Sequence, residues 1–205
     1  MLGESSPGAV SSPPQFDAVA IGSSAGGVEA LHVVLSALPA GLPATVLVVQ
    51  HMDPRHKSLL AGLLARRCRL SVREAVDGEP ALAGSVYIAP PDAHLIVRGG
   101  CLALTESELV NFSRPSIDLL FESVADAYGD RAIGVILSGS GVDGADGIRA
   151  IKGKGGTTIA QDPATAAHAG MPQAARATGC VDFVLPLGEI GLALISLVTP
   201  AAADL

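Results

Sequence analysis

A chain of 205 residues, 49% of them hydrophobic, can bury one sizeable core, which excludes a disordered protein. The formal net charge of −7 argues against nucleic-acid binding, and no apolar run reaches the roughly 20 residues of a membrane helix, so no membrane insertion is expected. Three widely spaced cysteines without metal-ligand spacing predict free thiols in a reducing compartment, the cytoplasm.

The two ends of the chain differ in composition from the rest. Residues 1–16 are rich in Ser, Pro and Gly and lack the basic and apolar regions of a secretory signal, so a disordered leader is expected there. Residues 17–198 are expected to form one domain, followed by a flexible tail over 199–205.

The first part of the domain alternates apolar runs with helical patterns. Residues 17–21 predict a buried strand ending in the glycine turn GSSAGG, and apolar residues at helical spacing predict a helix over 28–38. Residues 45–49 predict a second buried strand, and four leucines predict an amphipathic helix over 56–68.

The middle of the chain predicts three short strands, at 85–89, 94–98 and 101–105. Gly99-Gly100 joins the last two and signals a hairpin, so an antiparallel excursion is expected at one edge of the main sheet. A helix with one apolar stripe follows from Pro115.

The last part of the chain returns to alternating strands and helices. Strands are predicted at 132–138, 157–161 and 181–186, with helices between them and a final helix near 188–198. This alternation predicts an α/β fold: a doubly wound, mostly parallel sheet flanked by helices, with the hairpin at one edge.

The first glycine turn fits the pattern G-x-S-x-G between a strand and a helix, centred on Ser24 with Ser23 beside it. Such a turn presents a hydroxyl outward, and the following helix N-terminus offers N–H groups to an oxyanion. The same residues also suit a turn that needs small side chains for packing alone, so the motif by itself is weak.

His51 is the candidate base for this serine, because it directly follows the second predicted central strand. The other histidines, such as His94 at the start of an edge strand, lie in places where packing roles are expected. A lone histidine at a strand end is more often structural than catalytic.

Asp143 is the candidate acid, in the glycine-rich loop GSGVDG after the predicted strand at 132–138. Asp146 is its rival, although its position suits the first turn of the next helix. Carboxyl ends of parallel strands share one edge of a sheet, so Ser24, His51 and Asp143 are expected to meet there.

Other chemistries have weaker signals. The chain has no G-x-G-x-x-G after its first strand and no Walker motif, and its histidines and carboxylates lack metal-ligand spacing. No cofactor and no metal are therefore expected.

Taken together, the motifs resemble the catalytic domain of CheB, the receptor methylesterase of bacterial chemotaxis. The resemblance runs from about residue 17 to about residue 197 and rests, in the family's order, on AIGSSAGGVEAL, VVQHMDP, VYIAPPDAHL, NFSRPSIDLLFESVA, GVILSGSGVDGADG and IAQDPATAAHAGMPQAA. It implies a nucleophile at Ser24, a base at His51 and an acid at Asp143.

The resemblance also implies surroundings for these three residues. The implied oxyanion and substrate pocket comprises Ala25, Gly26, Gln50, Met52, Ser140, Gly141 and Met171. Family members often have Thr at the position of Ala25 and Met at that of Ser140, changes that bear on the pocket rather than on the triad.

The activity that the resemblance implies is hydrolysis of methyl esters on glutamate side chains of methyl-accepting chemotaxis receptors, with deamidation of receptor glutamines as a related activity. Full-length CheB carries an N-terminal receiver domain, whereas about 16 residues precede this core, so either a stand-alone methylesterase or an excised domain is expected. The motifs SGSGVDG and QDPATA favour the stand-alone protein. Two other classes remain open: a catalytically silent module that docks on receptors or a kinase, and a hydrolase of a small ester.

Overall fold

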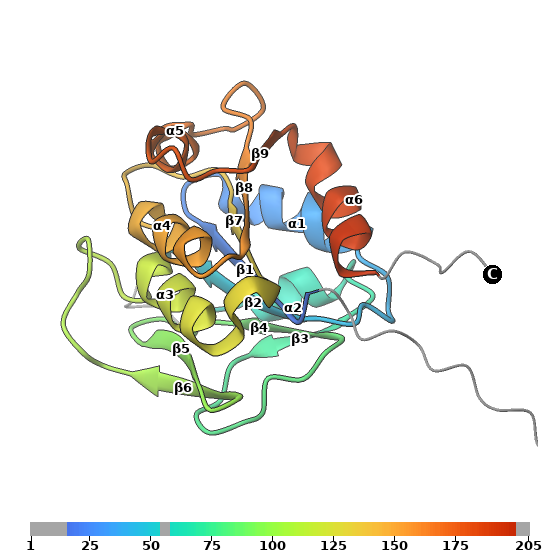
Figure 1. Ribbon diagram of the computed structural model, residues 1–205. Helices are drawn as coiled ribbons and strands as arrows, with labels where there is room; N and C mark the ends of the chain where they lie inside the picture. Colours follow the sequence, from blue (N-terminus) through green and yellow to red (C-terminus); the bar gives the residue numbers. More distant parts are fainter. Residues whose placement is uncertain (1–15, 54–57, 200–205) are drawn as a thin grey trace, which may run out of the picture.

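The computed structural model describes residues 16–53 and 58–199, and a parallel sheet forms its centre (Figure 1). The strands of this sheet are β1 (Ala18–Ser23), β2 (Thr45–Gln50), β3 (Ser71–Glu74), β4 (Ser85–Ile88), β7 (Ala132–Ile136), β8 (Thr157–Gln161) and β9 (Phe183–Leu185). Their order is β3-β4-β2-β1-β7-β8-β9, and every pair is parallel. The prediction of a doubly wound sheet is confirmed.

Helices cover both faces of the sheet. They are α1 (Gly27–Ala37), α2 (Leu60–Ala65), α3 (Ile117–Tyr128), α4 (Ala145–Gly153), α5 (Gly170–Ala177) and α6 (Leu187–Val198), with a 3-10 turn at Gly129–Arg131. Side chains of α1, α2 and α6 share one core with one face of the sheet, and those of α3, α4 and α5 share a second core with the other face. Figure 1 shows α1 and α6 side by side, with α3 and α4 across the sheet from them.

The sequence of β1 sets how closely α3 approaches the sheet. Val19 and Ile21 face the α1 side, whereas Ala18 and Ala20 face the α3 side. A Cβ at Gly22 would lie 2.4 Å from Cγ2 of Ile117, the first residue of α3. Small residues on this face of β1 therefore bring the N-terminus of α3 against the carboxyl end of the sheet.

The predicted hairpin forms, but apart from the main sheet. Strands β5 (His94–Arg98) and β6 (Cys101–Thr105) pair antiparallel as a separate two-stranded sheet, and their core residues belong to the α3 side. Residues 85–88, predicted to belong to the antiparallel excursion, instead pair parallel with β2 and β3.

Two further details differ from the sequence predictions. Phe16, placed in the expected leader, is buried in the core because it packs on the α1 side. The helix expected over 56–68 spans only Leu60–Ala65, and residues 56 and 57 lie outside the described ones, as do 1–15 and 200–205. In the described ranges no helix is long and apolar enough to cross a bilayer.

The strand order places a switch point at β1. The chain moves from β1 to β2 on one side, and later segments add β7 on the other side. Connections leave neighbouring strands in opposite directions at such a point, which opens a crevice at the carboxyl ends. The ends of β1, β2 and β7 therefore supply the segments of the candidate site.

Candidate active site

The turn after β1 is shaped by close backbone approach. Gly26 adopts a left-handed conformation (φ 72°), and a Cβ there would lie 2.7 Å from Cβ of Ala167 and 2.8 Å from Oγ of Ser138. The backbone N–H of Ser24 donates to the carbonyl of Ser138 at 3.0 Å. The glycine is therefore needed for both conformation and space, and the turn is tied to the end of β7.

Gln50, at the end of β2, fixes the two serines in different roles. Its Oε1 accepts from the Ser23 hydroxyl at 2.8 Å, and its Nε2 donates to the carbonyls of Ser24 (2.9 Å) and His51 (2.8 Å). Ser23 is fully buried, whereas Ser24 is half-buried and its hydroxyl has no hydrogen-bond partner within the part of the chain described. Of the two, Ser24 has the free hydroxyl.

His51 and Asp143 meet at the crevice. Nε2 of His51 lies 2.8 Å from Oδ2 of Asp143, and their side chains are 17% and 4% exposed. Burial alone would raise the pKa of Asp143, but hydrogen bonds from His51 and from backbone N–H groups outweigh it and lower the pKa to about 2. An ionised carboxylate only accepts, so Nε2 carries a proton, and in the neutral ring it is Nδ1 that has the lone pair.

The N-terminus of α3 provides most of the donors to Asp143. The carboxylate accepts five hydrogen bonds, from His51 Nε2, Asn111 Nδ2 (3.3 Å), Ser116 Oγ (3.1 Å) and the N–H groups of Ile117 (2.7 Å) and Asp118 (3.2 Å). Ser116 is the N-cap of α3. A helix N-terminus favours negative charge, so the backbone adds to the bond from His51 in keeping this acid ionised.

Asp118, in the first turn of α3, accepts hydrogen bonds from the N-terminus of α4, just as Asp143, which precedes α4, accepts them from the N-terminus of α3. Its Oδ1 accepts from the N–H groups of Gly144 (2.8 Å) and Gly147 (2.7 Å), at the start of α4, and its Oδ2 accepts from Nδ2 of Asn111 (2.8 Å). Burial raises the pKa of Asp118 to about 6, with the nearby charge of Asp143 adding to it and the bond from Gly147 opposing it. One asparagine amide thus bridges two buried carboxylates.

The glycine loop after β7 passes close to Ser24. A Cβ at Gly139 would lie 2.9 Å from Cβ of Ser24 and 2.1 Å from Sδ of Met171. The described part of the structure holds no hydrogen-bond acceptor for four N–H groups of the two turns, those of Ala25, Gly26, Ser140 and Gly141. Two sets of unpaired N–H groups on either side of a serine are what an oxyanion requires.

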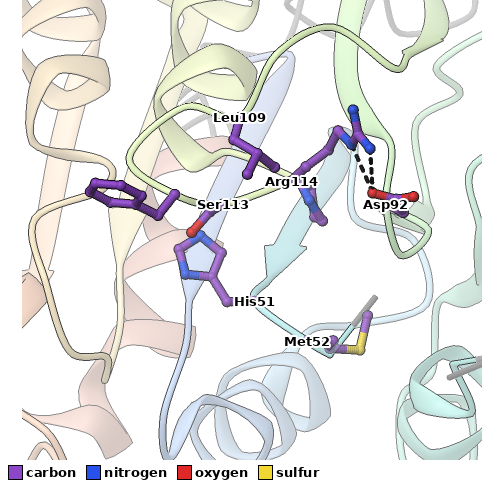
Figure 2. A pocket seen from close by; sticks show the side chains of 8 residues that line it. His51, Met52, Asp92, Leu109, Ser113 and Arg114 are labelled. Carbon is purple, nitrogen blue, oxygen red and sulfur yellow. Dashed lines mark hydrogen bonds and ion pairs between the residues drawn. The ribbon is translucent and has the colours of Figure 1, made fainter. Parts of the chain in front are cut away.

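Two hollows flank His51. The first, drawn in Figure 2, is lined by His51, Met52, Asp92, Leu109, Phe112, Ser113, Arg114 and Pro115. The second is lined by His51, Asn111, Phe112, Ser113, Ser140, Gly141, Val142 and Asp143. In Figure 2 Arg114 pairs with Asp92 on the far side of the first hollow from His51. The candidate base is thus reachable from two directions.

Similarity to known proteins agrees with this geometry. The sequence model of the CheB methylesterase family matches residues 19–194. The chain belongs to this family. In the part of the structure that is described, no three His, Cys, Asp or Glu side chains are grouped to hold a metal ion.

Individual relatives cover different shares of their own length. A protein-glutamate methylesterase/protein-glutamine glutaminase of Anaeromyxobacter dehalogenans is 48% identical over 180 residues, which are 88% of this chain but 53% of the relative. A putative protein of the same name from Leptospira interrogans is 40% identical over 183 residues, 89% of this chain and 95% of the relative. The crystal structure of the Thermotoga maritima CheB methylesterase catalytic domain superposes with a TM-score of 0.86 at 41% identity, covering 89% of this chain and 99% of that one. The chain therefore spans about half of the first relative and nearly all of the other two.

Some of the residues predicted for the CheB-type pocket line the hollows, and others are buried behind them. Met52, Ser140 and Gly141 line the hollows beside His51. Gln50 and Met171 are 3% and 1% exposed. They pack behind the reactive turns, so any role that they have is to position those turns.

Several residues of the site had no predicted role. They are His94, Asn111, Ser116 and Asp118. His94, expected at an edge, is fully buried; its Nδ1 accepts from the N–H of Ser116 at 3.0 Å, and its Nε2 lies 3.0 Å from the carbonyl of Glu108. The motif RPSID, with a helix-capping serine, was the available signal for Ser116 and Asp118.

Proposed function

We propose that this protein is a cytoplasmic serine hydrolase that removes methyl esters from glutamate side chains of chemotaxis receptors. The observation that carries the proposal is the pairing of His51 with an ionised, backbone-held Asp143, at the same sheet edge as the free hydroxyl of Ser24. The names of its relatives support the choice of a glutamate methyl ester as substrate and of glutamine as a second one.

The proposed reaction proceeds through an acyl-enzyme. Ser24 Oγ attacks the ester carbonyl carbon while Nδ1 of His51 takes the hydroxyl proton. N–H groups of Ala25 and of the Ser140 loop stabilise the oxyanion. The carbon–oxygen bond to the methoxy group then breaks, and His51 returns the proton so that methanol leaves.

Water completes the cycle. His51 accepts a proton from water as it attacks the acyl-enzyme carbonyl, and then protonates Ser24 Oγ as glutamate is released. Asp143 holds the ring and stabilises the imidazolium without taking the proton itself. With glutamine as substrate the same steps release ammonia in place of methanol.

Methanol release from radiolabelled, methylated receptor fragments tests the proposal. Ser24→Ala should lower turnover by about 10⁴-fold or more. Ser23→Ala is the matched control, because it removes a neighbouring hydroxyl that bonds Gln50 and should cost less than about tenfold. Equal losses in both variants would refute Ser24 as nucleophile. Receptor binding without turnover in the unmutated protein would indicate a silent docking module instead.

A further inference from the structure

Residues 110–113 form a tight turn beside the site. Val110 and Ser113 exchange two backbone hydrogen bonds, N–H of 110 to the carbonyl of 113 at 3.2 Å and N–H of 113 to the carbonyl of 110 at 2.9 Å. The central residues, Asn111 (φ 49°) and Phe112 (φ 60°), are both left-handed. This is the conformation of a type I′ turn, whose second central position favours glycine. A phenylalanine there is strained.

Bonds on both sides hold this turn in place. On one side Nδ2 of Asn111 donates to the carboxylates of Asp118 and Asp143. On the other, the guanidinium of Arg114 donates to Asp92 at 2.9 and 2.6 Å and to two carbonyls of the preceding loop. The direction in which Phe112 is presented is therefore fixed by the same network that holds the acid Asp143.

The ring of Phe112 is 99% exposed, although it is the largest apolar side chain of the turn. Phe112 lines both hollows that flank His51. Two other apolar side chains at the rims of these hollows, Leu109 and Val142, are 58% and 59% exposed. A strained backbone costs stability and an exposed aromatic ring contributes none, and here the two meet beside His51.

We propose that Phe112 is a specificity-determining residue that contacts an apolar side chain of a helical protein substrate, about one helical turn from the esterified glutamate. Residues three and four apart lie on one face of a helix, so a glutamate ester at His51 places such a neighbour beside the rim. A small ester has no such neighbour. The inference rests on the proposed function, because the substrate is taken to be a receptor helix.

Phe112→Gly is the informative variant, because glycine relieves the strain of this turn and should leave the protein at least as stable. The readout is kcat/KM for methylated receptor fragments divided by kcat/KM for p-nitrophenyl acetate. Loss of a buried phenylalanine contact should lower this ratio by about tenfold or more, mainly through KM for the receptor. Leu192→Ala is the control, since Leu192 is 63% exposed on α6, away from the site, and should leave the ratio unchanged.

The outcomes separate this inference from the proposed function. Receptor turnover with the same ratio in Phe112→Gly as in the unmutated protein would overturn the specificity role and leave the methylesterase proposal standing. A ratio lowered equally by Leu192→Ala would also overturn it. Hydrolysis of p-nitrophenyl acetate without any receptor turnover by the unmutated protein would refute the proposed substrate, and the inference with it.

Discussion

Replacing Asp118 by asparagine removes a buried carboxylate whose charge the fold disfavours. Burial and the neighbouring charge of Asp143 raise the pKa of Asp118 from 3.8 to about 6. Each pKa unit corresponds to about 1.4 kcal/mol. Ionising Asp118 in the folded protein therefore costs about 3 kcal/mol more than ionising it in the unfolded chain.

The sign of the pH dependence follows from this pKa. Because the folded pKa lies above the unfolded one, the folded protein binds more protons than the unfolded chain between about pH 4 and pH 6. The contribution of Asp118 to the free energy of unfolding is thus greatest below pH 4 and falls as pH rises through this window. An asparagine does not titrate, so the variant lacks this fall.

The hydrogen bonds of the variant add only a constant offset. Its side-chain oxygen can still accept from Gly144 and Gly147, while its amide meets the amide of Asn111, to which the carboxylate was bonded. Any cost of this contact is the same at every pH. The change of the stability difference with pH is therefore the quantity to measure, rather than its value at one pH.

Urea unfolding at pH 4, 5, 6 and 7 measures this change. Relative to the unmutated protein, Asp118→Asn should gain about 2 kcal/mol of unfolding free energy between pH 4 and pH 7, most of the full difference, because the unfolded carboxyl is already partly ionised at pH 4. Asp126→Asn, at an exposed carboxylate of the same helix, gives the background of losing one surface charge. A stability difference between Asp118→Asn and the unmutated protein that is constant over this range would refute the raised pKa and the reasoning from buried like charges.

Two further substitutions test packing around the reactive turns, and a third tests helix propensity at the end of α4. Gln50→Ala should lower stability by about 2 kcal/mol in urea unfolding and kcat by tenfold or more, because it removes the bond of the buried Ser23 hydroxyl and two bonds to the carbonyls of Ser24 and His51. Unchanged kcat would contradict the positioning role of Gln50. Gly139→Ala should lower kcat in the ester assay by about tenfold or more, since its Cβ would lie 2.9 Å from Cβ of Ser24. Gly153→Ala changes an open helical position, so it should instead raise the free energy of unfolding by about 0.5 kcal/mol. A thermal melt should show a slightly higher melting temperature, with activity retained.

Much of the sheet could be predicted because its strands are buried on both faces and read as aliphatic runs. Strands β1, β2 and β7 are fully buried along their length. Strand β3, with the sequence SVRE, was missed, because it is a partly exposed edge strand with two charged residues. The hairpin was predicted from its glycines, but its separation from the main sheet depends on packing against α3, for which a local pattern carries no signal.

The candidate site also contains residues that local sequence patterns predict and residues that they do not. Ser24, His51 and Asp143 follow central strands, so the rule of shared carboxyl ends was enough to bring them to one edge. Asn111 lies in a turn without a catalytic motif, and its bond to Asp143 joins residues 32 positions apart in the chain. Such a contact depends on how α3 and α4 pack, which composition and periodicity do not specify.

Both buried carboxylates of the site receive most of their hydrogen bonds from helix N-termini. Asp143 is held by the N-terminus of α3, and Asp118 by the N-terminus of α4. Four of the five bonds to Asp143 come from groups other than His51, and the backbone N–H groups among them add to the bond from His51, which lowers the pKa of Asp143 the most. A base that shuttles a proton between serine, leaving group and water must change its bonds at each step, whereas the acid must not. The two helices hold the carboxylates in place, and the hydrogen bonds of Asn111 connect these carboxylates to the turn that presents Phe112.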